Sequence, residues 1–510
     1  MPARDLTVVR IPLRSAKHHF GVHNSRGQRV YNEDTNQAGT IDMPAFAKRA
    51  PMSLTRSQMK SAGEGTSAAS AFGDPQIFYF AVFDGHGGSE CSEFLRDELH
   101  GYIEETAAEF ELESSLKQPY RSSTQDPIDM TPKSYAAAPA QVDMKTAGEV
   151  RDEVVLPNVN KRGVIEEAEQ AQPLQGKEPV PARADHSKVF KLEAELLREY
   201  RSTVGGYFRR FNSPYFSVPT RLNSIDDPNP NDLGSQKPVT IETILTYAFL
   251  RADLDFITAQ ARKKDPDDPY VADFPLNQDE ILGSPHLPPS GHGIGGPVRF
   301  KGGSTASVAL ISTPTPAPFW HPAAHSTLIV AHVGDTRILL CETATGLARP
   351  LTADHHPSSP AEASRLRRFA ESLVTDSFGE ERISGLANSR AFGDMQSKRI
   401  GVSAEPDITR VELGPAQYSF LVLMSDGVSG TLGDQEIVDV VKDAKTPEEG
   451  AKRVVEYATE VSADGDNATC LVVRLGGWER RSEGGLGSLG TREVRDARRA
   501  EALDPRRGRR

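Results

Sequence analysis

The chain contains an unbroken apolar run, Phe78 to Phe83, that stops abruptly at Asp84-Gly85-His86. Six consecutive apolar residues bounded by turn-forming residues are typical of a strand that is buried on both faces. The sequence therefore predicts a core strand whose end presents a carboxylate and a bare backbone carbonyl. An isolated Asp-Gly after a strand is usually a plain turn, so a functional interpretation requires similar features elsewhere in the chain.

Three other strand-like runs also adjoin an acid. Asp335 and Asp426 each follow an apolar run, and Asp466 precedes another. If these strands share one core with the strand that ends at Asp84, their acids converge on one rim. Carboxylates gathered in this way repel one another unless cations lie between them, and an all-oxygen site favours Mg²⁺ or Mn²⁺ over zinc. The sequence therefore predicts a site for hard divalent cations.

Seven short motifs are distributed over the region from about residue 20 to residue 475. In chain order they are Arg29-Val30-Tyr31-Asn32-Glu33-Asp34, Asp84-Gly85-His86-Gly87-Gly88, Gly302-Gly303-Ser304-Thr305-Ala306, Val333-Gly334-Asp335-Thr336-Arg337, Ser389-Arg390-Ala391-Phe392-Gly393-Asp394, Ser425-Asp426-Gly427 and Asp466-Asn467. A motif of a few residues carries little weight alone, but seven in one order are specific. The set resembles the ordered motifs of the PP2C (PPM) family of metal-dependent serine/threonine protein phosphatases.

The resemblance implies an α/β (α+β) fold, a sandwich of two antiparallel β-sheets flanked by α-helices. The residues alone indicate only mixed α and β structure. The resemblance further implies hydrolysis of phosphoserine and phosphothreonine in phosphoprotein substrates, by direct attack of a water that two metal ions activate, without a phosphoenzyme. The implied cofactors are two Mg²⁺ or Mn²⁺ ions, and a third ion is left open.

Single residues also receive roles from the resemblance. Asp84 is expected to bridge the two ions. Arg29 is expected to hold substrate phosphate with its guanidinium fork, and His86 is expected to protonate the departing alkoxide. The residues implied to lie in the metal shell, or just behind it for the first two, are Glu33, Asp34, Asp84, Gly85, Asp426 and Asp466.

Two further acids are candidates for lesser roles. Asp335 could hold a third, weaker ion, but Gly430 occupies the position, four residues after Asp426, where many relatives carry another acid. Asp394 is expected to brace the site by hydrogen bonds rather than to bind metal. Asp253 and Asp255 have the spacing of a paired-aspartate phosphatase motif, but they fall within a predicted helix, where no catalytic role is expected.

The phosphatase domain is expected to span residues 20–475. Loops are expected at 43–76 and 261–300, and residues 112–188 form a proline-rich insertion too poor in apolar residues to fold, so we expect disorder there. Apolar residues at helical spacing predict helices at about 95–110, where Ser89 can provide the N-cap, and at 189–211, 241–256, 434–443 and 447–460, with a further helix beginning near Pro360.

The two ends of the chain are basic. Residues 1–19 form an N-terminal extension with four basic residues and one acid, which fits either a targeting segment or a basic strand leading into the core. Residues 476–510 are rich in glycine and arginine and are expected to form a disordered tail.

Composition excludes several classes of protein. A net charge of −12 argues against a nucleic-acid binder. The three cysteines, Cys91, Cys341 and Cys470, are scattered, which favours a reducing compartment. None is followed six positions later by the arginine that a cysteine-based phosphatase loop requires. No apolar run approaches the length of a membrane span, and we expect a monomer.

The motif Ser425-Asp426-Gly427-Val428-Ser429-Gly430 resembles a mitochondrial branch of the family, whose members act on mitochondrial metabolic enzymes. We therefore expect an intracellular protein, either mitochondrial or located in the cytoplasm or nucleus. A catalytically inactive, PP2C-like binding or scaffold protein is the main alternative function, although such a relative is expected to lack at least one of Asp84, Asp426 and Asp466. A two-metal nuclease conflicts with the acidic charge and the motif order.

Overall fold

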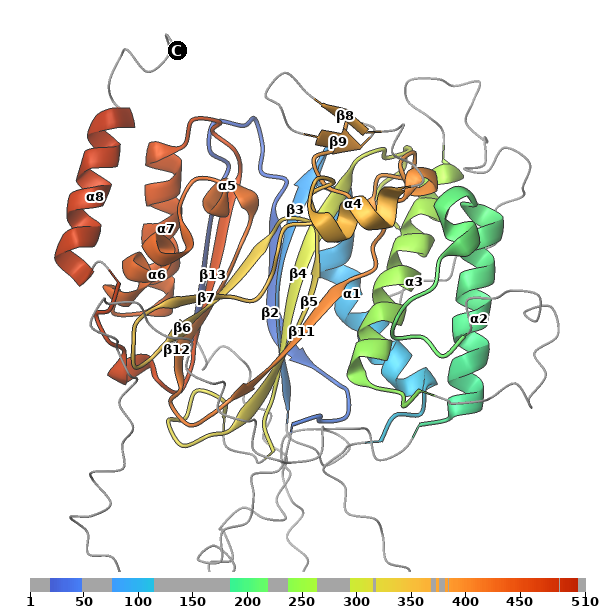
Figure 1. The fold of residues 1–510 in the computed structure, drawn as a ribbon, viewed down its shortest axis with the longest axis horizontal. Coiled ribbons are helices and arrows are strands. Elements are labelled where there is room, and N and C mark those ends of the chain that lie inside the picture. Colours follow the sequence, from blue (N-terminus) through green and yellow to red (C-terminus); the bar gives the residue numbers. More distant parts are fainter. Residues whose placement is uncertain are drawn as a thin grey trace, which may run out of the picture. The chain divides into compact units, whose positions relative to one another are not determined.

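The computed structural model describes residues 19–47, 76–113, 184–218, 237–263, 294–314, 318–367, 373–375, 381–383, 385–485 and 487–502. Two antiparallel β-sheets lie at the centre of this part of the chain, with helices on either side of the pair (Figure 1). The helices α1, α2 and α3 lie on one side, and α6, α7 and α8 lie on the other.

The first sheet has five strands, and each neighbouring pair is antiparallel. In spatial order the strands are β1 (Phe20–Ser25), β13 (Ala468–Arg474), β12 (Tyr418–Met424), β6 (Arg337–Glu342) and β7 (Ala348–Pro350). Met424 pairs with Cys470 of β13 and with Arg337 of β6. The end of β12 therefore lies between the beginnings of β13 and β6.

The second sheet has six strands, again antiparallel. In spatial order they are β11 (Asp407–Leu413), β5 (Ser326–Val333), β4 (Gly303–Ser312), β3 (Ile77–His86) and β2 (Thr35–Ile41), and the short β10 (Phe392–Gly393) also pairs with β4. A separate hairpin joins β8 (Leu373–Thr375) to β9 (Glu381–Ile383).

The apolar run of β3 is buried on both of its faces. Phe80 and Val82 point to the inner side and belong to one cluster with Leu421 of the first sheet. Tyr79 and Phe83, at the alternate positions, belong to the cluster beneath the helices. Because the strand lies between a sheet and a helical layer, it needs apolar residues at every position. The predicted sandwich of two antiparallel sheets with flanking helices is confirmed.

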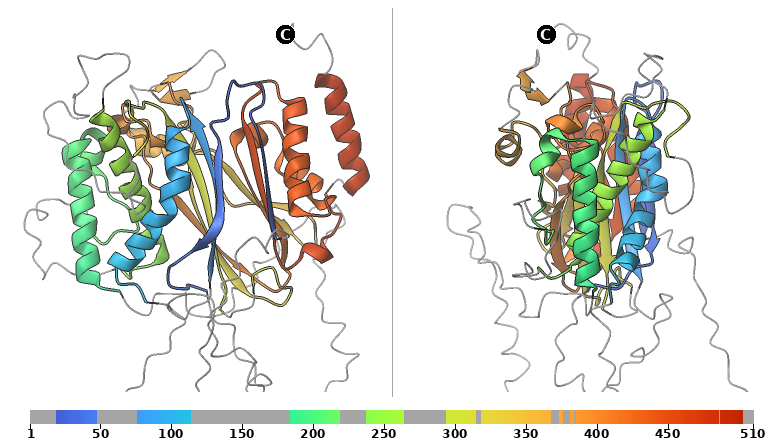
Figure 2. Two further views of the ribbon diagram at one scale, coloured as in Figure 1. Left: turned by 180° about the vertical axis from the view of Figure 1, so that it is seen from behind. Right: turned by 90° about the vertical axis from the view of Figure 1, so that its right-hand side faces the viewer.

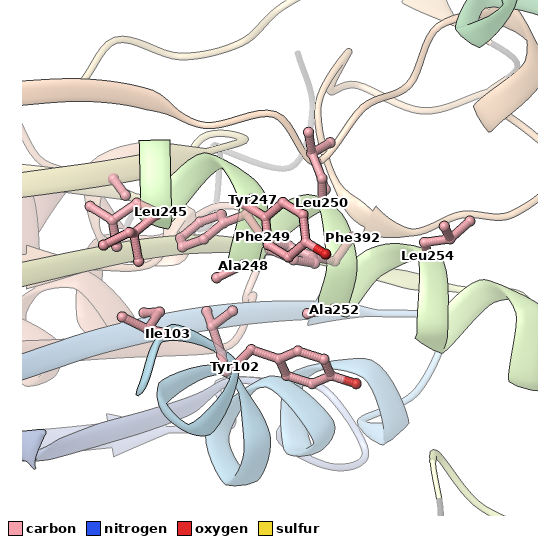
Figure 3. Packing of buried hydrophobic residues seen from close by; sticks show 14 of the residues in the cluster. Tyr102, Ile103, Leu245, Tyr247, Ala248, Phe249, Leu250, Ala252, Leu254 and Phe392 are labelled. Carbon is pink, nitrogen blue, oxygen red and sulfur yellow. The ribbon is translucent and has the colours of Figure 1, made fainter. Parts of the chain in front are cut away.

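Helices cover the outer face of each sheet. Over the second sheet lie α1 (Glu90–Glu109) and α3 (Ile241–Ala261), with α2 (His186–Thr203) beside α3; over the first lie α6 (Asp434–Lys442) and α7 (Pro447–Val461) (Figure 2). Helix α3 is buried almost all round, and its Phe249 packs against Phe392 near Tyr102 and Ile103 of α1 (Figure 3). Within the described residues no helix is both long and apolar enough to span a bilayer.

The helices differ from the predicted ones in two places. The stripe predicted over 189–211 is interrupted, because α2 ends at Thr203 and Gly205 and Gly206 take positive φ angles of 66° and 51° before a short 3₁₀ helix, η2 (Gly206–Arg210). Glycine adopts such angles without the steric cost that other residues pay. Ser89 precedes α1 as predicted, but its side chain makes no capping hydrogen bond.

The predicted disordered tail is wrong for residues 478–485 and 487–502. A 3₁₀ helix, η7 (Trp478–Arg480), is followed by α8 (Gly487–Ala502), which packs beside α6 and α7.

Several predicted segments lie outside the described residues. They are most of the insertion at 112–188, the larger parts of the loops at 43–76 and 261–300, and residues 1–18. Two short helices complete the fold, α4 (Pro360–Leu366) and α5 (Asp426–Ser429), with η6 (Lys398–Ile400) between them in the chain.

Candidate metal centre

Acids from both sheets meet at one rim of the sandwich. Asp84 lies near the end of β3, where it pairs with Thr305 of β4. Asp335 lies in the tight connection from β5 to β6, and Asp426 begins α5 directly after β12. Carboxylate oxygens of Asp84, Asp335 and Asp426 all lie within 4.8 Å of one another. The strand ends therefore bring together three acids that are distant in sequence.

Burial and mutual repulsion disfavour the charged forms of these three acids. Burial, followed by the charges of Asp426, Asp34 and Asp335, raises the pKa of Asp84 well above its usual range. Burial and then the charge of Asp426 raise the pKa of Asp335 to about 7. Burial is also the main cause that raises the pKa of Asp426 to about 6. A divalent cation would relieve this repulsion, and an all-carboxylate donor set fits Mg²⁺ or Mn²⁺.

Asp466 lies beside this group but outside the set of three. Its Oδ2 accepts a hydrogen bond from Arg29 Nη2 at 2.7 Å, and its Oδ1 accepts one from the backbone N–H of Asn467 at 2.8 Å. Its charge nevertheless contributes to the raised pKa values of Asp34 and Asp426. Asp466, predicted as a main ligand, thus lies outside the set of three, whereas Asp335, predicted only for a third ion, lies within it.

Asp34 lies behind the group, in the interior. The hydroxyl of Ser425 donates to its Oδ2 at 2.7 Å and accepts from the N–H of Thr469 at 2.9 Å. Burial, opposed by the hydrogen bond from Ser425, raises the pKa of Asp34 to about 6. This chain of hydrogen bonds ties the segment before β2 to the ends of β12 and β13, so Asp34 can brace the site from behind.

Glu33 holds the neighbouring backbone rather than facing the three acids. Its Oε1 accepts from the N–H of Gly88 at 2.6 Å, and its carbonyl accepts from the hydroxyl of Ser92 at 2.5 Å. Gly85 packs closely against this carbonyl, because a Cβ on residue 85 would lie 2.6 Å from the Glu33 carbonyl oxygen. Only glycine allows this close approach, which leaves the backbone of residue 85 at the rim beside Asp84.

His86 and Asp394 form a pair at the same rim. Both carboxylate oxygens of Asp394 lie 2.9 Å from His86 Nε2. The histidine side chain is 39% exposed, while that of Asp394 is 4% exposed. Burial alone lowers the pKa of His86, but the hydrogen bond and the charge of Asp394 outweigh it and raise the pKa. Asp394 thus holds the accessible imidazole of His86 in one orientation, and its bracing role in the site stays a prediction.

Arg29 is an accessible cation beside the three acids. Its side chain is 56% exposed, and its partner Asp466 is 36% exposed. An exposed ion pair of this kind contributes little to stability, because water screens both charges. The guanidinium can therefore leave the carboxylate for another anion at little cost.

Three residues that support the site received no role from the sequence. Asn467 donates from Nδ2 to the carbonyls of Arg26 and Tyr31 and accepts at Oδ1 from the N–H of Glu33, which anchors the loop that carries Arg29. Asn467 and Ser425 both lie within the seven motifs, so the motif resemblance could have identified them as residues of the site. Asn388, which hydrogen-bonds the carboxyl of Asp335, follows no pattern that sequence reasoning could have used.

Comparisons with known proteins agree with these motifs. Residues 298–466 match the family described as protein phosphatase 2C. The chain is 36% identical over 289 residues to protein phosphatase 2C homolog 4 of Schizosaccharomyces pombe, and the aligned region covers 56% of this chain and 63% of the relative. It is 36% identical over 177 residues to the mitochondrial protein phosphatase 1K of Xenopus laevis, covering 34% of this chain and 44% of the relative.

A solved structure, that of a serine-threonine phosphatase 2C from Toxoplasma gondii, aligns with a TM-score of 0.43 and 16% identity over 89% of this chain and 94% of that one. A TM-score of this size carries no inference about function. The matched segments span less than two thirds of the length of both sequence relatives. On the ordered motifs, the domain matched at residues 298–466 and the identity to these relatives, the chain is similar to proteins of the protein phosphatase 2C family.

Proposed function

We propose that the chain is a metal-dependent protein phosphatase that hydrolyses phosphoserine and phosphothreonine in phosphoprotein substrates. The observation that carries this proposal is the meeting of Asp84, Asp335 and Asp426 within 4.8 Å at one rim, although they come from distant segments of the chain. His86 lies in the same motif as Asp84. Arg29 donates a hydrogen bond to Asp466 beside this group. Similarity to protein phosphatase 2C proteins gives further support.

Asp84, Asp335 and Asp426 would hold the metal, with Asp466 and the carbonyl of Gly85 as further donors. The bound Mg²⁺ or Mn²⁺ ions would lower the pKa of a shared water toward neutrality and offset the charge of the phosphate. Glu33 and Asp34 would support these donors from behind through their hydrogen bonds. We propose two ions and leave a third open, with Asp335 as its candidate ligand and glycine at residue 430.

The remaining steps belong to Arg29 and His86. Arg29 would leave Asp466 and bind two phosphate oxygens of the substrate, for which its planar fork is well suited. His86, oriented by Asp394, would give its proton to the seryl or threonyl oxygen as the phosphorus–oxygen bond breaks. Asp466 would then be free to act as a metal donor, so binding of phosphate and of metal would favour each other.

The proposal is tested by release of phosphate from phosphoserine and phosphothreonine peptides in the presence of Mn²⁺. Asp84→Asn and Asp426→Asn are each expected to lower kcat/KM by about 10²-fold or more, because each removes a charged donor from the site. Asp97→Asn, which changes an acid that is 55% exposed on α1, is the control and should leave the rate unchanged. Equal rates in the two site variants and the wild type would defeat the proposal.

The alternative is an inactive, PP2C-like binding or scaffold protein. The retention of Asp84, Asp426 and Asp466 argues against it, because a protein that only binds a partner has no need for the full set of acids. The same experiment separates the two functions, since an inactive relative would release no phosphate in the presence of Mn²⁺. Cleavage of nucleic acid instead of phosphopeptides would favour a two-metal nuclease.

We further propose a mitochondrial location. The support is the identity to a mitochondrial relative from Xenopus laevis, together with the form of the motif at Asp426. Fractionation of cells that express the tagged full-length protein tests this location. Recovery of the protein with the cytosolic or nuclear fraction would contradict it.

A further inference from the structure

Asp253 is a buried acid that the site described above does not use. It lies within α3, and it is completely inaccessible to solvent. Its Oδ1 accepts a hydrogen bond from the backbone N–H of Gly393 at 2.9 Å. Its Oδ2 lies 2.8 Å from Lys398 Nζ and 3.1 Å from the hydroxyl of Tyr200. The carboxylate therefore connects α2 and α3 to the segment that leads into Asp394.

Lys398 holds the same segment from its other end. It is also completely inaccessible, and its Nζ donates to the carbonyl of Ala391 at 2.7 Å. The pair of Asp253 and Lys398 thus contacts the residues on both sides of Phe392. Removing two charges from water is costly, and apolar residues of similar volume often stabilise a fold equally well. A buried pair in this position suggests a task besides stability.

The segment that the pair holds has an unusual backbone. Gly393 and Asp394 adopt positive φ angles of 71° and 44°, and a positive φ is uncommon for a residue other than glycine. The N–H of Asp394 donates to the carbonyl of Gly302 at 2.9 Å. With this backbone both carboxylate oxygens of Asp394 lie 2.9 Å from His86 Nε2. A shift of Gly393 would therefore move the group that orients the histidine.

We propose that Asp253 is a positioning residue for the His86–Asp394 pair. By fixing the N–H of Gly393 it holds Asp394, and through Asp394 it holds His86 where its proton can reach the leaving oxygen. This inference rests on the proposed phosphatase function. In that reaction the water oxygen forms a bond to phosphorus and the bond to the seryl oxygen breaks. The seryl oxygen keeps the electron pair and takes the proton from His86, while the water proton passes to solvent.

The inference makes the effect of Asp253 depend on the leaving group. An alkoxide leaves poorly and needs a proton, whereas p-nitrophenolate is stable enough to leave without one. A loss of positioning should therefore slow hydrolysis of a phosphoserine peptide much more than hydrolysis of p-nitrophenyl phosphate. A purely structural role for Asp253 would instead slow both reactions equally, because it would disturb the whole rim.

Two matched double variants isolate the hydrogen bond to Gly393. Asp253→Leu with Lys398→Met removes both buried charges and the acceptor, whereas Asp253→Asn with Lys398→Met removes both charges but keeps an oxygen for the Gly393 N–H. The first is expected to lower kcat/KM about tenfold to 10²-fold for the phosphopeptide and less than about threefold for p-nitrophenyl phosphate. The second should restore the phosphopeptide rate to within about threefold of wild type.

A background variant without the histidine gives a readout independent of overall stability. With His86→Ala already present, adding Asp253→Leu with Lys398→Met should cause no further loss on the phosphopeptide, because the proton donor is already gone. Equal losses on the two substrates, failure of the asparagine variant to restore activity, or full additivity with His86→Ala would each overturn the inference.

Tyr200→Phe keeps the test possible if the double variants do not fold. It removes the hydroxyl that contacts both Asp253 and the carbonyl of Leu250, and it leaves the contacts of Asp253 with Gly393 and Lys398 in place. We expect kcat/KM to fall about threefold for the phosphopeptide and to stay unchanged for p-nitrophenyl phosphate. An equal change in kcat/KM for the two substrates would contradict the inference. A wild-type protein that hydrolyses neither substrate would refute the proposed function itself, which is a different result.

Discussion

Carboxylates with raised pKa values occupy two kinds of surroundings in this molecule. At the rim, Asp84, Asp335 and Asp426 face one another, and their charges are costly unless a cation lies between them. In α2, Glu193 is completely inaccessible and faces main-chain groups, with the N–H of Ser217 donating to its Oε2 at 2.8 Å. The first kind suits a metal site, and the second affects only stability.

Glu193 should make the stability of the fold depend on pH. Burial, opposed by the N–H groups of Ser217 and Val218, raises the pKa of Glu193 from 4.5 to about 7. Between these two values the folded state keeps a proton that the unfolded chain releases, so the free energy of unfolding falls as pH rises from 4.5 to 7. Glu193→Gln should remove this contribution, which is at most about 3 kcal/mol.

The measurement is chemical denaturation of wild type and Glu193→Gln at pH 5, 6 and 7.5. The gap between the two stabilities should change steadily in favour of the variant as pH rises. Glu195→Gln on the same helix is the control, since that side chain is 47% exposed and should show no such trend. A constant gap between wild type and Glu193→Gln would show that burial does not perturb this carboxyl.

Sequence reasoning identified the acids at the rim because each one interrupts or borders an apolar run. Asp84 and Asp426 stand out for this reason, and the motifs then supplied His86 and Arg29. Asp253 could not be found in this way, because an acid in a helix gives no sign that its partner, Gly393, lies 140 positions away in the chain. Contacts of that kind depend on the tertiary fold.

At the scale of elements, α8 shows where composition misleads. Its many arginines and neighbouring glycines indicate a disordered tail, yet the helix packs beside α6 and α7. Its contacts are polar rather than apolar. Arg498 donates to Glu436 at 2.7 Å and to the carbonyl of Thr431 at 2.8 Å, and its guanidinium lies 5.9 Å from the ring centre of Tyr457. A search for apolar periodicity cannot detect a helix held in this way.

Loss of Arg498 should therefore loosen α8 without unfolding the rest of the protein. Arg498→Ala removes two charge-assisted hydrogen bonds and a cation–π contact, for an expected local loss of about 1–3 kcal/mol. Hydrogen exchange of the α8 amides should be faster in Arg498→Ala than in the wild type. In the wild type it should also become faster at high salt, because salt screens these contacts. Arg492→Ala, at a side chain that is 73% exposed, is the control. Unchanged exchange in Arg498→Ala would contradict this account of how α8 is held.

At the scale of the whole molecule, the two sheets are joined at the rim by groups that repel each other. Asp84 comes from the second sheet and Asp426 follows a strand of the first, so a cation between them would link the two layers. The sandwich itself followed from the motif resemblance, whereas the residues alone indicated only mixed α and β structure. Periodicity identifies strands, but it does not determine which strands pair or which faces meet.

The central claim is that these separated acids hold divalent cations, and a thermal unfolding titration with Mn²⁺ tests it most directly. Binding to the folded state alone should stabilise the wild type by about 2.7 kcal/mol at a free concentration 100 times the Kd, so its Tm should rise with Mn²⁺. Asp84→Asn should abolish most of this rise, while Asp97→Asn should keep it. A wild-type Tm that does not respond to Mn²⁺, or an equal rise in Asp84→Asn, would contradict the claim.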